Sequence, residues 1–77
     1  MRDVLINWEP VELYKILKFE GIASSGGEAK LAIAEGYVLV NGEVETQKRK
    51  KIVSGDVIEI GEEILRVVLE GGVSGSV

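Results

Sequence analysis

The apolar positions change their spacing in the middle of the chain, which divides it into a helical part and a strand-rich part. In the first part, Leu13, Ile16 and Leu17 recur at the spacing of one helical face. Pro10 suits the first position of a helix, because its missing N–H would be unpaired there anyway. We therefore expect a first helix over residues 10–20.

A second helix is predicted to begin just after Ser25. Ser25 and Glu28 have the spacing of a capping box, in which the serine accepts from the backbone N–H three residues on and the glutamate reaches back. The helix continues through residues 29–35 and stops at Gly36. It has only two or three turns, so its stability must come from packing.

Beyond the second helix the pattern is that of strands. Residues 37–40 are β-prone, Asn41-Gly42 is typical of a type I′ hairpin turn, and residues 43–45 are expected to form the second strand of the hairpin. Turn-like segments separate three further expected strands, at residues 52–53, 57–60 and 64–69. The run at residues 4–6 forms either a short edge strand or a packed N-terminal arm. We predict an α+β fold, with two short N-terminal helices packed on a small sheet of four or five strands.

The length of the chain bounds its organisation. Seventy-seven residues suffice for one modest core, so we expect a single domain over residues 1–70 and a flexible C-terminal tail over residues 71–77. The N-terminus lacks the apolar core of a signal peptide, and no apolar run approaches the roughly 20 residues that cross a bilayer. A cytoplasmic location is the expectation.

The composition lacks the residues that most catalytic mechanisms use. The chain has no cysteine and no histidine, and hence no thiolate, no disulfide and no imidazole base. The carboxylate pairs, Glu43 with Glu45 and Glu62 with Glu63, fall at a hairpin and a turn, where solvation explains them, and no calcium-loop pattern is present. We expect no enzyme activity, no metal and no cofactor.

The charge is negative overall but unevenly distributed. A net charge of −4 argues against general attraction to nucleic acid, so an RNA interpretation must rest on a local patch. Lys48, Arg49, Lys50 and Lys51 are consecutive cations that repel one another, which favours an anionic partner. The alternative is an exposed strand edge that lysines protect from aggregation. In an extended chain Lys48 and Lys50 would face one side, and Arg49, on the other, is the best candidate for a bidentate phosphate or base contact.

The start of the second helix is the other candidate site. Gly26 and Gly27 occupy the first helical positions, where free N–H groups and the helix dipole favour a phosphate and missing side chains admit an RNA backbone. The alternative is a helix start that needs glycine dihedral angles. Lys30, one turn further on, is a surface residue unless it points to the same side as this turn, where it would add a charge-assisted phosphate contact.

The aromatic residues do not predict a base-stacking platform. Tyr14 and Phe19 lie in or beside the apolar stripe of the first helix, so we expect core packing. Trp8 is expected to act as a staple against that helix, and Tyr37 is expected to be partly exposed.

Three segments in a fixed order carry a family resemblance: Ser25-Gly26-Gly27-Glu28-Ala29-Lys30, then Glu35-Gly36-Tyr37-Val38-Leu39-Val40-Asn41-Gly42, then Ser54-Gly55-Asp56-Val57-Ile58. They resemble the RNA-binding domain named for ribosomal protein S-four, the alpha-L motif, and more closely its stand-alone bacterial YbcJ-like family. The similarity covers about residues 11–60.

The resemblance implies a two-helix unit on a small sheet that binds structured RNA, ribosomal or transfer RNA, with a ribosomal or RNA-modifying protein as a further partner. We expect a monomer. It places the RNA at the helix start and the basic stretch, through Ser25, Gly26, Gly27, Lys30, Lys48, Arg49, Lys50 and Lys51. Many family members have arginine at the position of Gly26, so backbone donors and Lys30 would have to substitute for that contact.

Two other functions are alternatives to RNA binding. A protein-interaction module could dock its basic stretch on an acidic partner. A ubiquitin-like sulfur carrier is suggested by Gly55-Asp56 and Gly71-Gly72, but such carriers end in Gly-Gly and here five residues follow Gly72.

Overall fold

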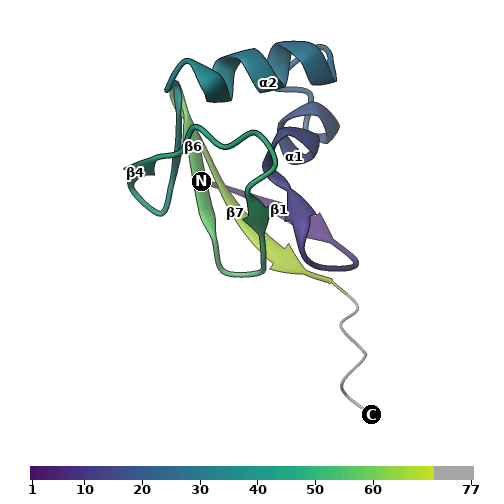
Figure 1. The fold of residues 1–77 in the computed structure, drawn as a ribbon. Helices are drawn as coiled ribbons and strands as arrows, with labels where there is room; N and C mark the ends of the chain where they lie inside the picture. The colour runs from purple at the N-terminus through teal and green to yellow at the C-terminus, as the bar shows by residue number, and fades with distance from the viewer. Residues whose placement is uncertain (71–77) are drawn as a thin grey trace.

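The computed structural model describes residues 1–70, whose helices and strands follow one another as drawn in Figure 1. In chain order these elements are β1 (Arg2–Ile6), β2 (Val11–Glu12), α1 (Leu13–Phe19), α2 (Gly26–Ala34), β3 (Val38–Val40), β4 (Glu43–Val44), β5 (Lys51–Ile52), β6 (Val57–Ile60) and β7 (Glu63–Leu69). The predicted tail, residues 71–77, lies outside the described residues.

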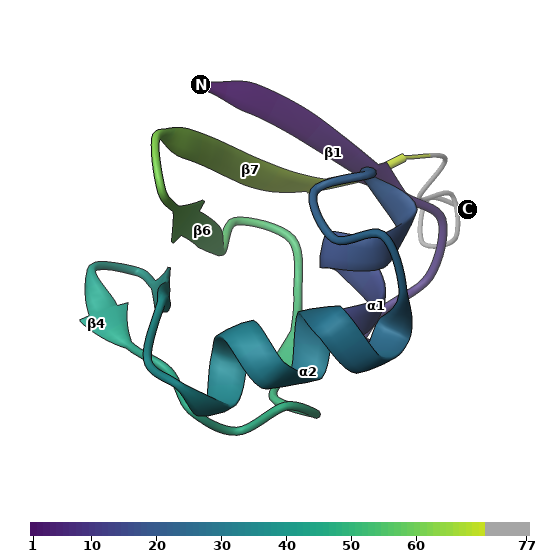
Figure 2. The ribbon, with the colours of Figure 1, turned by 90° about the horizontal axis from the view of Figure 1, so that it is seen from above.

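The main sheet has five strands in the order β1-β7-β6-β3-β4. It is mixed, because β1 runs parallel to β7 while the other neighbours are antiparallel. The helices α1 and α2 pack on each other, and the view from above shows both to one side of the strands (Figure 2). The predicted α+β architecture is thus confirmed, and the N-terminal run is an edge strand rather than a packed arm.

The predicted start of the first helix is wrong. The helix begins at Leu13, three residues later than expected, because Val11 and Glu12 form β2 and pair with β5 in a separate two-stranded ribbon. In this ribbon Val11 lies opposite Ile52, and both side chains are buried in the core. The burial of this pair outweighs the local helical pattern, and no local pattern reveals a partner that lies 41 residues away.

The Asn-Gly and Gly-Asp pairs that carried part of the family resemblance hold the strands in place. Asn41 and Gly42 have φ values of 53° and 84°, as the predicted type I′ turn requires. The side-chain amide of Asn41 donates to Asp56 Oδ1 at 3.1 Å, and the Val57 N–H donates to Asn41 Oδ1 at 2.9 Å. Asp56 Oδ2 accepts from the Val53 N–H at 3.0 Å. These contacts join the hairpin turn to the start of β6 and give both motif pairs a structural role.

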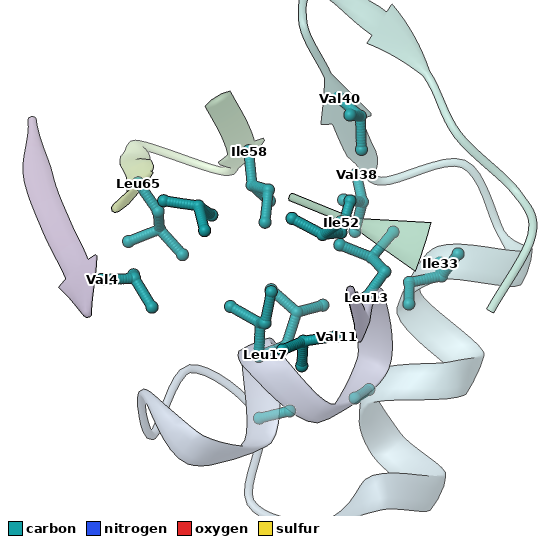
Figure 3. Packing of buried hydrophobic residues seen from close by; sticks show 14 of the residues in the cluster. Val4, Val11, Leu13, Leu17, Ile33, Val38, Val40, Ile52, Ile58 and Leu65 are labelled. Atoms are coloured by element: carbon teal, nitrogen blue, oxygen red, sulfur yellow. The ribbon is translucent and has the colours of Figure 1, made fainter. Parts of the chain in front are cut away.

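The core lies between the helices and the sheet (Figure 3). The predicted stripe of Leu13, Ile16 and Leu17 is confirmed, since all three are buried. Leu13 and Leu17 face side chains from the sheet and from β5 in this cluster. The remaining buried apolar residues are Val4, Ile6, Val11, Ala23, Ala29, Ile33, Val38, Val40, Ile52, Ile58, Leu65 and Val67.

Two of the expectations for the aromatic residues are wrong. Phe19 is 62% exposed, because it lies about 120° around α1 from the buried stripe at 100° per residue. Trp8 is 60% exposed, so it is not buried as a staple against α1. Tyr37 is exposed as predicted, and Tyr14 packs partly buried against the core. The surface therefore carries more aromatic area than the sequence pattern indicated.

Candidate nucleic-acid interface

The start of α2 is built around two serines and one glutamate. Ser25 is the N-cap, and its Oγ accepts from the Glu28 N–H at 3.1 Å, as the capping box predicts. The reciprocal contact differs from the prediction, because Glu28 Oε1 accepts from the N–H and the hydroxyl of Ser24, each at 2.9 Å, and not from Ser25. The Glu28 carboxylate therefore fixes Ser24, the residue before the N-cap, to the first turn of α2.

The first two N–H groups of α2 remain available. The Ala29 N–H donates to the Ser25 carbonyl at 3.0 Å, and the Glu28 N–H is taken by the Ser25 hydroxyl. The N–H groups of Gly26 and Gly27 have no acceptor within residues 1–70. Together with the positive end of the helix dipole, they form a pair of donors suited to an anion.

The two glycines are not required by the backbone. Neither Gly26 nor Gly27 has a positive φ, so the interpretation that this helix start needs glycine dihedral angles is wrong. An added Cβ at Gly26 would meet the Tyr14 ring at 3.7 Å, and one at Gly27 would meet Ser25 Oγ at 3.9 Å, both ordinary contacts. A methyl group would fit at either position. Because glycine has no side chain, the N–H groups of Gly26 and Gly27 stay open to a ligand.

Residues 48–51, the basic segment, are bound to α1 through their backbone. The carbonyl of Lys50 accepts from the Leu13 N–H at 2.9 Å, and the carbonyl of Lys48 accepts from the Tyr14 N–H at 3.2 Å. Since α1 has no side-chain cap, these carbonyls satisfy its first donors. The segment turns at Lys48 and Arg49, so the predicted alternation of an extended chain fails there.

The ring of Tyr14 joins the two halves of the candidate site. Lys30 Nζ, from α2, lies 4.6 Å from the ring centroid, and Arg49 Cζ, from the basic segment, lies 5.5 Å from it. Lys15 Nζ is 6.0 Å away. These distances are within the range of cation–π attraction. Lys30 therefore lies on the same side as the Gly26 turn, as a phosphate contact would require.

The cations differ in how far carboxylates neutralise them. Arg49 Nη1 lies 3.4 Å from Glu12 Oε1, which also contacts Lys15 Nζ at 3.6 Å. By contrast, no ion pair within residues 1–70 involves any of the four lysines of the candidate site, Lys30, Lys48, Lys50 and Lys51. The lysines are thus more available to a ligand than Arg49. The sequence had favoured Arg49 as the best candidate for a phosphate or base contact.

The structure brings three of the eight predicted residues to the Tyr14 ring: Gly26, where an added Cβ would be 3.7 Å from it, and the cations of Lys30 and Arg49. Ser25 and Gly27 adjoin Gly26 at the start of α2. The carbonyls of Lys48 and Lys50 accept from the Tyr14 and Leu13 N–H groups, and Lys51 lies in β5 opposite Glu12. Sequence reasoning missed Tyr14 and Glu12, because both look like ordinary helix residues. Their role depends on a contact between segments 35 residues or more apart.

Two negative findings concern the described part of the chain. Within residues 1–70, no group of three or more histidine, cysteine, aspartate or glutamate residues is placed to hold a metal ion. In the same range, neither helix has the length and apolar character needed to cross a membrane.

The hydrogen bonds at Glu28 predict a pH effect on stability. The Ser24 N–H, and then the Ser24 hydroxyl, hold the pKa of the Glu28 carboxyl below its usual value, against a small opposing effect of burial. A carboxyl with a depressed folded-state pKa stabilises the fold above its unfolded pKa, and this contribution is lost as the pH falls through the folded value. We expect Glu28→Gln to lower the thermal midpoint near pH 7, with the difference from wild type shrinking as acid protonates the folded-state carboxyl.

The matched variant for this experiment is Ser24→Ala, which keeps the backbone donor and removes only the hydroxyl. Its thermal midpoint is expected to fall by less than that of Glu28→Gln. A difference between wild type and Glu28→Gln that stays constant from about pH 7 to pH 3 would contradict the role of the ionised carboxylate.

The comparisons with known proteins now define the class. A model of the S4 domain family matches residues 4–68, so the chain belongs to the S4 domain family. It is 52% identical over 58 residues to "Putative RNA-binding protein YbcJ" of Escherichia coli (strain K12), covering 75% of this chain and 83% of that protein. It is 39% identical over 57 residues to "Probable ribosome maturation protein RlbA" of Bacillus subtilis (strain 168), covering 74% and 80%.

A solved structure agrees with this class. The solution structure of YbcJ from E. coli, described as revealing an alfaL motif involved in RNA-binding, matches with a TM-score of 0.69 at 46% identity. The match covers 88% of this chain and 87% of that one. The family resemblance seen in the sequence is thereby confirmed.

Proposed function

We propose that this protein binds structured RNA, without catalysing a reaction, through the start of α2 and the basic segment. One observation carries the proposal. In a chain of net charge −4, Lys30 of α2 and Arg49 of the basic segment lie over the Tyr14 ring beside Gly26, which has an open backbone N–H group. The lysines Lys30, Lys48, Lys50 and Lys51 form no ion pair within residues 1–70. Phosphate oxygens are the ligands that such a mixed set of ammonium and N–H donors fits best.

The relatives support the same function. YbcJ is named as an RNA-binding protein, and RlbA is named as a ribosome maturation protein. We therefore propose ribosomal RNA as the leading RNA class, with transfer RNA as the alternative, and ribosomal or RNA-modifying proteins as neighbours on that RNA. A cytoplasmic location follows from this proposal. The contacts are to phosphates and shape, since the interface offers few groups for reading base edges.

An equilibrium titration in increasing salt tests the proposal. A fluorescently labelled ribosomal RNA hairpin is titrated with the protein between 50 and 200 mM salt, and an unstructured RNA of the same length serves as the control. With three or four phosphates neutralised, the logarithm of the association constant should fall with a slope of about −2 to −4 against the logarithm of salt concentration. An absence of binding, or an affinity that salt does not change, would contradict the proposal.

Tyr14 provides a second test, because its ring links the two halves of the site. Replacing it with leucine preserves apolar packing but removes the ring that attracts Lys30 and Arg49. We expect the affinity for the hairpin to fall by roughly five- to thirtyfold, from two cation–π interactions of about 0.5–1 kcal/mol each. The control Tyr14→Phe keeps the ring and should bind like wild type. Equal affinities for all three proteins would show that the ring does not position the cations.

A further inference from the structure

Trp8 stands between two hollows of the surface. One is a cleft of about 220 Å³ lined by Trp8, Pro10, Val11, Glu12, Lys15 and Lys51. The other, of about 100 Å³, is lined by Leu5, Ile6, Asn7, Trp8, Val11 and Phe19, none of them charged. Trp8 is the single tryptophan of the chain, and it is 60% exposed. Sequence reasoning gave this side chain a packing role that its exposure does not support.

The larger cleft, called here the Trp8 cleft, is a product of the β2–β5 ribbon. Val11 and Ile52 face inward at one register position, so the next pair, Glu12 and Lys51, faces outward. Lys15 lies in the first turn of α1 and is held by its ion pair with Glu12. The cleft therefore combines an aromatic wall with two ammonium groups and one carboxylate, and of the two lysines only Lys51 forms no ion pair within residues 1–70.

This combination of groups matches a nucleotide. Aromatic side chains stack on unpaired bases, while lysines attract the phosphates next to them. The volume is below the roughly 300–1,000 Å³ of drug-sized pockets, which suits one planar base rather than a larger ligand. The uncharged hollow on the other side of Trp8 lacks the cations that would hold a phosphate.

The Trp8 cleft is continuous with the proposed interface. Lys51 lines it and is the last residue of the basic segment. Glu12 also lines it, and its carboxylate contacts Arg49 beside the Tyr14 ring. An RNA backbone that follows the basic segment toward Lys51 would thus bring its next nucleotide to Trp8.

We propose that the Trp8 cleft binds one unpaired nucleobase of the bound RNA, stacked on the indole, with the flanking phosphate at Lys51. This inference rests on the proposed RNA-binding function and adds to it a preference for RNA with an unpaired nucleotide. The protein should bind a hairpin with a single unpaired nucleotide more tightly than a fully paired hairpin.

The test compares two hairpins of equal length, one with a single-nucleotide bulge and one fully paired. Binding is followed by anisotropy of labelled RNA and by the fluorescence of Trp8. We expect the bulged hairpin alone to quench Trp8 strongly. The change Trp8→Ala should lower affinity for the bulged hairpin by about 5- to 150-fold, the range for loss of one base–aromatic stack. Affinity for the paired hairpin should stay within twofold, and Trp8→Phe should retain most of the preference.

The matched control is Phe19→Ala, which removes an equally exposed aromatic side chain from the uncharged hollow. It should leave the preference for the bulge unchanged. If wild type binds both hairpins equally, or if Trp8→Ala weakens both to the same degree, the base site is overturned while RNA binding stands. If wild type binds neither hairpin, the proposed function itself fails.

Discussion

The double change Lys48→Glu, Lys51→Glu is expected to lower the affinity for structured RNA at least 100-fold in about 100 mM salt, while the protein stays folded. Both side chains are exposed and form no ion pair within residues 1–70. Each reversal replaces an attraction to phosphate by a repulsion, and a phosphate contact near a protein surface is worth on the order of 1 kcal/mol or more. The slope of the logarithm of the association constant against the logarithm of salt concentration should also become less negative by about one unit per lost contact. Anisotropy titrations at several salt concentrations measure both effects.

The matched control is the double change Arg2→Glu, Arg66→Glu, which alters the net charge by the same amount. Arg66 pairs with Asp3 at 3.1 Å on the β1–β7 edge, and Arg2 contacts Glu63 at 3.8 Å. Exposed ion pairs of this kind contribute about 0–1 kcal/mol, so the fold should persist, as circular dichroism can check. Equal loss of RNA binding in both double variants would mean that net charge, and not the basic segment, controls affinity.

The change Ile52→Ala is expected to cost about 2–5 kcal/mol of the free energy of unfolding. Ile52 is fully buried in the two-residue strand β5, where it lies opposite Val11. Domains of this size have stabilities near the low end of about 5–15 kcal/mol, so the variant should lose much of its stability. Urea denaturation followed by circular dichroism measures the loss.

The neighbouring change Val53→Ala serves as the control, because Val53 is 41% exposed and should cost less than about 0.5 kcal/mol. Since β5 carries Lys51 and continues from the basic segment, Ile52→Ala should also weaken RNA binding, in proportion to the unfolded or detached fraction. Similar stabilities of the two variants would show that the β2–β5 ribbon does not anchor the basic segment.

The helices and strands that depend on local chemistry could be predicted from the sequence. The Ser25 cap, the stop at Gly36 and the Asn41-Gly42 turn each need only neighbouring residues, and the structure confirms all three. The start of α1 could not be predicted in the same way. Val11 leaves the helical pattern to pair with Ile52, and that pairing is a property of the folded chain.

The same distinction applies to the candidate site. Clustered charges and consecutive glycines are visible in the sequence, so the candidate residues could be proposed without the structure. Their common location depends on two backbone hydrogen bonds from α1 to the basic segment and on the ring of Tyr14 between Lys30 and Arg49. The availability of each cation also depends on the fold, because Arg49 shares Glu12 with Lys15 only in the folded chain.

The most direct test of the proposed interface is a titration of ¹⁵N-labelled protein with a structured ribosomal RNA hairpin, followed by amide chemical shifts. The account predicts that the largest shifts occur at the open N–H groups of Gly26 and Gly27, at Lys30 and along residues 48–51. The amides of β1 and β7 around Asp3 and Arg66 should change little. Shifts confined to β1 and β7, with the Gly26 and Gly27 amides unchanged, would contradict the proposed interface.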